Sequence, residues 1–445
     1  MTDRDLELRL RDWFAADARD DVAPAQLRES VLALPRTGPG PLVPAIPRRQ
    51  LWWLAAAAML AIATSAAVLT AGRPSAPSTP PTASSSFSRA PSLAAQAGAW
   101  TYTGDMVAMR SDGFRTNWAV LLLDGRVIAA GGDGSSGPYA EAELFDPATE
   151  QWTATAPMSI GRAGLMLVVL RDGRVLAAGG YDGAHTLASA ELFDPVTQRW
   201  TPTGSMTFAR SYGTATLLDD GRVLVAGGMR EEPCAGGAPC PDPATTAETY
   251  DPVTGSWTRV GDLADPAGRW LQTATKLADG RVLLVGGHHL LALQSAEVFD
   301  PRTDRFVRVA DMAAGRSQQS AVLLSDGKVL VLGGQIKTLP ADPTIPAELF
   351  DPATGTWRQT SPDSGTGFAA AATLADGRVL AIGGGLAAWM FDPPTEAWSL
   401  GAVPPTHDPS MLIGLQDGRV VAFGVRVSFG ASSAATYVFD PKAAP

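Results

Sequence analysis

Seven near-copies of one sequence pattern occupy residues 100–445, and this repeat constrains the fold more than any other feature of the chain. Each copy has an apolar run, a DGR-type turn, a second apolar run ending in Gly-Gly, a variable loop and an aromatic-Asp-Pro motif. The turn aspartates are Asp124, Asp172, Asp220, Asp279, Asp326, Asp376 and Asp417. A spacing of about 50 residues is typical of four-stranded β-propeller blades rather than of helical solenoids.

The third repeat illustrates how one copy forms a blade of strands a, b, c and d, counted outward from the axis. The Asp-Gly pair between a and b predicts a type I′ hairpin turn, because Gly tolerates a positive φ. The motif Tyr250-Asp251-Pro252 predicts the c–d turn, in which Asp accepts hydrogen bonds from the following backbone and Pro presets φ. The expected strands are 211–218, 222–228, 246–250 and 256–260.

A large aromatic residue follows each c–d turn of the first six repeats, and its size suits a wedge between neighbouring blades. These residues are Trp152, Trp200, Trp257, Phe306, Trp357 and Trp398. The seventh repeat runs through Phe439-Asp440-Pro441 without a strand d of this kind. Residues 99–106 (AWTYTGDM) read like the strand d at 256–263 (SWTRVGDL). We therefore expect this N-terminal strand to complete the seventh blade, which removes both open sheet edges.

With its Gly-Gly, aromatic-Asp-Pro and Trp motifs, the segment 99–441 resembles kelch-repeat, galactose-oxidase-like seven-bladed propellers. The resemblance implies an all-β fold, with the propeller domain at 99–445. Galactose oxidase holds copper with two His and two Tyr, one of them bonded to a Cys. No tyrosine here can be matched to that set, and the histidines are His185, His288, His289 and His407. We therefore expect no copper, no other metal or cofactor, and no enzymatic activity.

Residues 51–72 contain an uncharged stretch, Leu51–Thr70, that is long enough to span a bilayer as one helix. Trp52 and Trp53 fit an interfacial aromatic belt, and Arg48–Arg49 precede the span, which favours a cytoplasmic N-terminus. A cleaved signal peptide is the alternative, but its n-region would be far longer than usual. We predict a single-pass protein of the cell membrane, with a Pro/Ser/Thr/Ala-rich stalk at 73–98 and an extracytoplasmic propeller.

Residues 1–50 form the predicted cytoplasmic head, with two short amphipathic helices. Leu6, Leu10, Trp13 and Phe14 make one apolar stripe at helical spacing. The stripe packs within the head or on the membrane, or binds a partner. Residues 1–72 weakly resemble the head and anchor of bacterial anti-sigma-factor proteins, which implies a sigma factor as partner.

The charge bears on the kind of ligand that the propeller can bind, and the cysteine content bears on its disulfide bonding. The net charge of −10 lies beyond residue 72, and an acidic propeller is unsuited to nucleic acid. The two cysteines, Cys234 and Cys240, are close in sequence, and outside the cytoplasm a local disulfide is the expected state.

A ring of basic residues marks the start of strand a, near the mouth of the central channel. The set comprises Arg115, Arg162, Arg210, Arg269 and Arg316, with His407 in the seventh repeat. Guanidinium groups here could hold a carboxylate or sulfate, whereas the structural alternative is that they bond to neighbouring carbonyls. The variable b–c loops open on the same face, where recognition is expected.

A second basic series follows the DGR turn: Arg126, Arg174, Arg222, Arg281, Lys328, Arg378 and Arg419. We expect these side chains to pair across strands with Glu143, Glu191, Glu248, Glu297 and Glu348 on strand c.

Taken together, the sequence predicts a membrane-anchored, extracytoplasmic propeller that binds an unknown ligand or protein on its b–c loop face. If binding to the propeller changes what the cytoplasmic head does, the protein would act as a sensor. The alternatives are a secreted or surface carbohydrate-active enzyme and a purely adhesive surface module.

Overall fold

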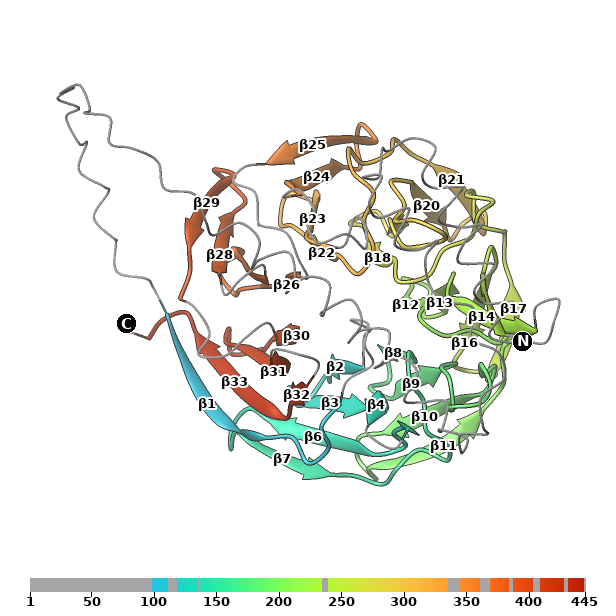
Figure 1. The fold of residues 1–445 in the computed structure, drawn as a ribbon, viewed down its shortest axis with the longest axis horizontal. Coiled ribbons are helices and arrows are strands. Elements are labelled where there is room, and N and C mark those ends of the chain that lie inside the picture. The colour runs from blue at the N-terminus through green and yellow to red at the C-terminus, as the bar shows by residue number, and fades with distance from the viewer. Residues whose placement is uncertain are drawn as a thin grey trace, which may run out of the picture. The chain divides into compact units, whose positions relative to one another are not determined.

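Antiparallel β-sheets follow one another around a central axis in the computed structural model (Figure 1). The structure describes residues 98–110, 118–134, 137–233, 239–334, 345–360, 369–383, 387–402, 409–427 and 431–443. The predicted head, membrane helix and most of the stalk lie outside these residues. Within the described ranges, no helix is long and apolar enough to cross a membrane.

Seven blades make up the ring, and each has four main strands in the order a-b-c-d from the axis outward. Blade 1 contains β2 (Ala119–Leu121), β3 (Val127–Ala130), β6 (Ala142–Asp146) and β7 (Gln151–Ala154). Blade 2 contains β8 (Met166–Val169), β9 (Val175–Ala178), β10 (Ala190–Asp194) and β11 (Arg199–Thr203). Blade 3 contains β12 (Thr214–Leu217), β13 (Val223–Ala226), β16 (Ala247–Asp251) and β17 (Ser256–Arg259).

The remaining blades repeat this order. Blade 4 contains β18 (Thr273–Lys276), β19 (Val282–Val285), β20 (Ala296–Asp300) and β21 (Arg305–Arg308). Blade 5 contains β22 (Ser320–Leu323), β23 (Val329–Leu332), β24 (Ala347–Asp351) and β25 (Thr356–Thr360). Blade 6 contains β26 (Ala369–Thr373), β27 (Val379–Gly383), β28 (Ala387–Asp392) and β29 (Ala397–Leu400). Blade 7 contains β30 (Pro409–Gly414), β31 (Val420–Val427) and β33 (Ala435–Asp440).

The N-terminal strand closes the ring, as the sequence predicts. β1 (Ala99–Asp105) pairs antiparallel with β33, and Trp100 lies opposite Phe439 (Figure 1). The Trp100 indole N–H also donates a 2.8 Å hydrogen bond to Ala402 O, just after the outer strand of blade 6. The first and last described strands thus share one sheet. The predicted strands of the third repeat are confirmed as well, each within a few residues of β12, β13, β16 and β17.

Short extra hairpins extend some b–c loops. Blade 1 carries β4 (Asp133–Gly134) with β5 (Gly137–Pro138), and blade 3 carries β14 (Met229–Pro233) with β15 (Pro239–Pro243). In blade 7, β32 (Ala431–Ser433) pairs with β31. The face bearing these loops, here called the loop face, therefore varies from blade to blade, whereas the a–b and c–d turns form a uniform opposite face, here called the turn face.

The a–b turn differs from the predicted type I′ geometry. In blade 1, Gly125 N donates to Leu122 O, and Leu122 N donates to Arg126 O. Gly125 has a φ of 90°, whereas Asp124 is not among the residues with positive φ. A type I′ turn requires positive φ at both central residues, so this is a type I turn followed by a Gly bulge. The Asp is retained because its carboxylate accepts a hydrogen bond from Arg126 N at 3.1 Å.

The c–d turn has the predicted hydrogen bonding. Asp146 Oδ1 accepts from Ala148 N at 2.9 Å, and Glu150 N donates to Asp146 O. The same arrangement in blade 2 holds the pKa of Asp194 below its usual value, chiefly through the hydrogen bond from Val196 N. Each aromatic-Asp-Pro motif is thus a hydrogen-bonded reversal between strands.

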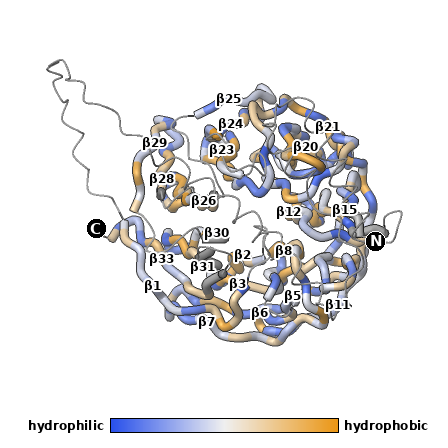
Figure 2. Tube along the Cα trace, in the orientation of Figure 1, coloured by the Kyte–Doolittle hydropathy of each residue, from blue (hydrophilic) through white to orange (hydrophobic). Residues whose placement is uncertain are grey.

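Apolar side chains fill the blades and the spaces between them. Strand b is fully buried in blades 1 to 5, and Figure 2 shows apolar residues along middle strands such as β28. The aromatic residue before Asp-Pro packs against the wedge aromatic across the c–d pair, as in Phe145–Trp152 with 5.3 Å between ring centroids. Trp257 Nε1 donates to Gly204 O after the outer strand of blade 2, and Trp357 Nε1 donates to Ala310 O after that of blade 4. The wedge prediction is confirmed, because these indoles bond as well as pack between blades.

Candidate functional site

A buried arginine occupies the connection between each of blades 1 to 4 and the next, before strand a of blades 2 to 5. Arg210, before blade 3, shows the arrangement most fully. Its Nη1 donates to Gly227 O at 2.9 Å and to Thr246 O at 2.8 Å, and its Nη2 donates to Glu248 Oε1 at 2.9 Å. The side chains of Arg210 and Glu248 are both fully buried. One guanidinium therefore joins the end of strand b to the start of strand c within its blade.

The partner carboxylate also binds the connection that carries the arginine. Glu248 Oε2 accepts from Thr207 N at 2.7 Å, three residues before Arg210. Burial lowers the pKa of Arg210, and the charge and hydrogen bond of Glu248 oppose that shift. The same ion pair forms in blades 2, 4 and 5, as Arg162–Glu191 at 3.0 Å, Arg269–Glu297 at 2.9 Å and Arg316–Glu348 at 2.6 Å.

In blade 1 this position belongs to Arg110, which is not among the arginines predicted from the sequence. Arg110 Nη2 lies 2.9 Å from Glu143 Oε1, and its Nη1 donates to Gly131 O at 2.7 Å. Counting back from the turn aspartate places Arg115 at this position instead. Counting forward from the preceding Met would have found it, because Met106 stands four residues before Arg110 as Met158 stands four before Arg162. Arg115 and His407 themselves lie outside the described residues.

These contacts bear on the two interpretations of the arginine ring. The four described members, Arg162, Arg210, Arg269 and Arg316, are each 0% exposed, and their Nη donors bond to carboxylate and carbonyl oxygens. An anion would have to displace these buried partners to reach a guanidinium group. The geometry favours the structural alternative, and binding by these arginines stays a prediction.

The expected pairing of the second basic series with the strand-c glutamates is wrong. Those glutamates already bind the buried arginines, and the second series instead pairs within its own turn. All seven pairs form, from Arg126–Asp124 at 2.6 Å to Arg419–Asp417 at 2.8 Å. The side chain two residues after the turn Asp folds back over the turn, which places it away from strand c.

Several of these turn arginines also join neighbouring blades. Arg174 of blade 2 donates to Pro252 O of blade 3, and Arg222 of blade 3 donates to Pro301 O of blade 4. Arg419 of blade 7 donates to Pro147 O of blade 1 across the ring closure. Each acceptor is the Pro carbonyl of an aromatic-Asp-Pro motif. The turn face is therefore held together by the two motifs that define the repeat.

A cavity of about 300 Å³ lies on the axis at the loop-face end of the innermost strands. Strand a and the residues just before it supply most of its described lining, from blades 2 to 7. No described lining residue carries a charge at pH 7. The polar ones are Tyr212, Thr214, Gln272, Thr273, Gln318, Gln319 and Ser320.

Non-Gly residues with a positive φ occur at the rim of this cavity and also in c–d turns of the turn face, where Glu150, Gln198, Asp304 and Glu396 adopt it. The second residue after the buried arginine has a φ of 56° in Tyr212, 56° in Leu271 and 58° in Gln318. Non-Gly residues rarely adopt this region, and such strain is often found at functional sites. Blade 2 has Gly164 there, at a φ of 57°. A chain of backbone bonds runs between blades at these positions, because Leu271 N donates to Tyr212 O and Gln318 N donates to Leu271 O.

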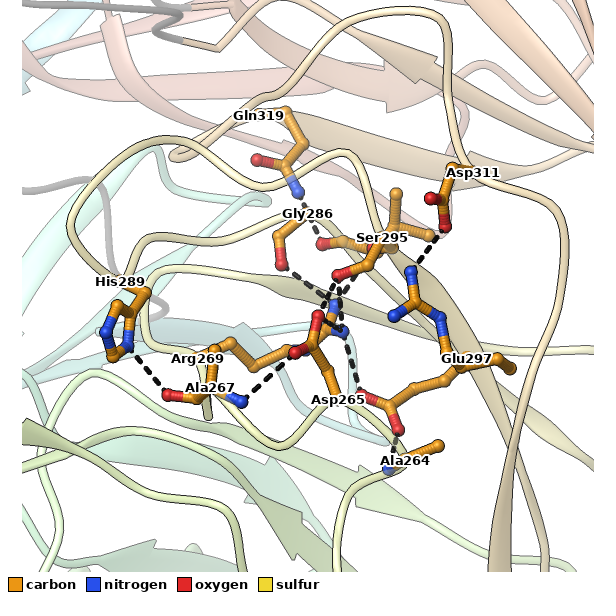
Figure 3. A network of polar contacts seen from close by, with 12 residues as sticks. Ala264, Asp265, Ala267, Arg269, Gly286, His289, Ser295, Glu297, Asp311 and Gln319 are labelled. Atoms are coloured by element: carbon orange, nitrogen blue, oxygen red, sulfur yellow. Dashed lines mark hydrogen bonds and ion pairs between the residues drawn. The ribbon is translucent and has the colours of Figure 1, made fainter.

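Blade 4 departs from the common arrangement by adding a second carboxylate to its arginine. Asp265 Oδ2 lies 3.5 Å from Arg269 Nη2 and also accepts a hydrogen bond from Ser295 (Figure 3). Asp265 and Pro266 are a two-residue insertion relative to the connections that contain Met158 or Met312. Burial raises the pKa of Glu297, although the charge of Arg269 opposes it. Two acids thus share one buried cation.

The comparisons with known proteins identify the repeat. Residues 115–159 and 164–207 match the Kelch motif family. The first two blades therefore carry Kelch motifs, within a fold that is a seven-bladed β-propeller. Among solved structures, the chain is similar to a fungal alcohol oxidase of the AA5 family in complex with copper. The identity is 14%, with 78% of this chain and 76% of that chain covered and a TM-score of 0.44. A comparison with curated proteins found no match.

Three histidines of the Kelch propeller are described, all in b–c loops. His185 is exposed in blade 2, whereas His288 packs edge-on against Trp270 in blade 4, with 5.4 Å between ring centroids. Burial lowers the pKa of His288, and His289 Nδ1 contacts Ala267 O at 2.7 Å. Within the described ranges, no three His, Cys, Asp or Glu residues are grouped to hold a metal. The predicted disulfide depends on Cys234, which lies outside them.

We expect the buried pair of blade 3 to stabilise the Kelch propeller strongly. Arg210→Met leaves Glu248 buried without its cation and should lower the free energy of unfolding by about 3–5 kcal/mol. Combining it with Glu248→Leu should recover part of this loss, because no unpaired charge remains. Urea denaturation followed by tryptophan fluorescence measures both.

Arg174→Met is the matched control, because it breaks a half-exposed pair on the turn face and should cost less than about 1 kcal/mol. Equal effects of Arg210→Met and Arg174→Met would contradict the anchoring role of the buried pair.

Proposed function

We propose that this Kelch propeller is an extracytoplasmic binding domain whose ligand or protein partner contacts the loop face. The observation that carries the proposal is the contrast between the two faces of the ring. Ion pairs and inter-blade hydrogen bonds occupy the turn face, and its turns differ little among blades. The loop face has the cavity and loops of unequal length.

The loop face also exposes apolar side chains beside the cavity-lining elements of blade 4. Leu290 is 82% exposed and Leu291 is 61% exposed, in the loop that follows His288 and His289. Exposed leucines in adjacent positions are unfavourable in water, and a partner that covers them would recover that cost. Variable loops carried on a rigid scaffold are the usual place for recognition.

The proposal includes membrane attachment through residues 51–70 and a signalling head at 1–50. Its support is the sequence: an uncharged span, the arginines before it, and the stripe of Leu6, Leu10, Trp13 and Phe14. In this scheme, occupancy of the propeller changes what the head binds in the cytoplasm, with a sigma factor as the partner that the resemblance implies. We propose a binding role and not a catalytic one.

Topology is the first test. Protease added to intact cells should remove the propeller and leave a small N-terminal fragment in the membrane, because the span separates the two parts. Immunoblots against both ends of the chain detect these products. A propeller found in the medium without residues 1–72 would show a cleaved signal, and both the anchor and the sensor scheme would then be abandoned.

The loop face can be tested by site-specific crosslinking in cells. A benzophenone amino acid at position 290 should give an adduct with the partner, detected by gel shift for a protein or by intact mass for a small molecule. Position 196 is the control, because Val196 is 90% exposed on the turn face. An adduct at 196 only, or equal adducts at both positions, would contradict binding on the loop face.

The head is tested separately. The double variant Trp13→Ala, Phe14→Ala removes most of the apolar area of the stripe and should abolish the cytoplasmic interaction that depends on it. Asp12→Ala, on the opposite side of the predicted helix, should leave that interaction intact. Transcript profiling together with co-purification reads out both. If the double variant matches wild type in both measurements, the regulatory role of the head fails.

A further inference from the structure

A short antiparallel bridge ties the b–c loop of blade 4 to the connection before strand a of the same blade. His288 N donates to Trp270 O at 2.8 Å, and Trp270 N donates to His288 O at 3.2 Å. The His288 imidazole packs against the Trp270 ring, with 5.4 Å between ring centroids and 76° between ring planes. The exposed Leu290 and Leu291 follow in the same loop. The bridge therefore holds the start of the segment that carries these leucines.

The bridge belongs to the repeat, but the imidazole does not. The same pair of backbone bonds joins Ala163 to Tyr181 in blade 2 and Ser211 to Met229 in blade 3, at 2.8 or 2.9 Å in each case. Tyr181 and Met229 carry no charge near neutral pH. Of these three described bridges, only that of blade 4 contains a group that ordinarily titrates between about pH 5 and pH 8.

The surroundings of the His288 ring disfavour a positive charge. Its Nδ1 is buried and has no hydrogen-bond partner. Burial lowers the pKa of His288; the backbone of His289 opposes this shift, and the charge of His289 adds to it. A proton on this ring would place a charge where water cannot reach Nδ1 and no acceptor replaces it, which is unfavourable.

The charged groups near His288 offer it no counter-ion. Among the residues that the structure describes, no carboxylate forms an ion pair with this imidazole. On its own loop, the titratable neighbour is His289. On the two connections packed against the loop, Asp265 and Arg269 pair with each other, and Arg316 pairs with its strand-c glutamate.

The neighbouring His289 holds the loop in either charge state. Its Nδ1 lies 2.7 Å from Ala267 O (Figure 3). A carbonyl oxygen only accepts hydrogen bonds, so Nδ1 carries a hydrogen, and Nε2 is the atom that would gain a further proton. The bond to Ala267 therefore persists when His289 is protonated. His288 is the group in this loop whose protonation opposes the closed arrangement.

We propose that the b–c loop of blade 4 is acid-sensitive: protonation of His288 breaks its bridge to Trp270 and releases the segment that carries Leu290 and Leu291. At neutral pH the bridge holds these leucines in one arrangement, and at acid pH it does not. The inference rests on the proposed function only in giving loop-face binding a pH dependence, and its test requires no partner.

The sign of the effect follows from proton linkage. In the open loop, His288 has the ordinary histidine pKa of about 6.5. Its pKa is lower in the closed loop, so the open loop binds the proton more tightly. The closed state is therefore fully stable above about pH 6.5 and loses stability as the pH falls below that value. Between about pH 7.5 and pH 5.5, the equilibrium constant for opening should rise by up to about tenfold.

Hydrogen–deuterium exchange of the purified full-length chain measures this opening. Mass spectrometry with fragmentation resolves the amide of His288, and its protection factor corrects for the intrinsic pH dependence of exchange. We expect this protection to fall about three- to tenfold between about pH 7.5 and pH 5.5. The bridge amides of Tyr181 and Met229 are internal controls and should keep their protection.

His288→Phe retains an aromatic ring against Trp270 but takes no proton, so the fall in protection should disappear. His185→Phe is the matched control, because His185 is also in a b–c loop but its side chain is 81% exposed. This change should leave the fall at His288 as in wild type. If His288→Phe already opens the loop at neutral pH, His288→Gln replaces it.

Four results overturn the inference: a fall of less than about threefold at His288, an equal fall at Tyr181 and Met229, a fall that survives at position 288 of the variant, or protection that rises at acid pH. The last result would show that attraction between the imidazolium and the Trp270 ring outweighs burial. Failure of the proposed function is a separate outcome, because crosslinking at position 290 at neutral pH reports on binding while His288 is uncharged.

Discussion

The ion pair between a buried arginine and a strand-c glutamate is the interaction on which the loop face depends. In blade 3, Arg210 joins the carbonyl of Gly227 to Glu248, and Glu248 holds the backbone N–H of Thr207 in return. The b–c loop, the d–a connection and the start of strand a therefore share one buried contact. Breaking this contact would leave an unpaired buried charge, which is strongly unfavourable. The backbone segments that carry the pair are therefore held in place, independently of the sequence of the b–c loops.

Because the buried arginine is held in place, the positions of the residues that follow it are also restricted. In blades 2 to 5 the residue two positions after the arginine has a positive φ and bonds to the neighbouring blade. Three positions after it, Gly213, Gln272 and Gln319 line the cavity in blades 3 to 5. Substitution at these two positions alters the cavity without altering the anchor. Blades 2 to 5 present Gly164 and Leu165, Tyr212 and Gly213, Leu271 and Gln272, and Gln318 and Gln319.

The repeat predicts the propeller well, because strand alternation, turn motifs and closure by residues 99–106 are all local patterns. The partners of Glu248 could not be predicted in the same way. Both Arg210 and Arg222 are near it in the expected blade, and only the turn geometry shows that Arg222 folds back onto Asp220. Arg110 was not predicted because the spacing to the turn aspartate varies, whereas the Met-to-Arg spacing is the same in blades 1, 2, 3 and 5. The burial of Gln272 and Gln319 could not be predicted from the sequence, because a glutamine at the start of a strand is usually expected to face solvent.

The best candidates for functional residues are those that differ among the blades and lie close to the buried arginine–glutamate pair that the blades share. Among the described residues, seven ion pairs within the a–b turns and five buried arginine–glutamate pairs have nearly the same geometry in each blade where they occur. These pairs therefore do not distinguish one blade from another. Blade 4 departs from this uniformity in two places: Asp265 adds a carboxylate beside Arg269, and Gln272 follows Arg269 by three residues. Among the described connections before strand a, which belong to blades 2 to 5, these departures from the repeat lie in blade 4, beside the axial cavity.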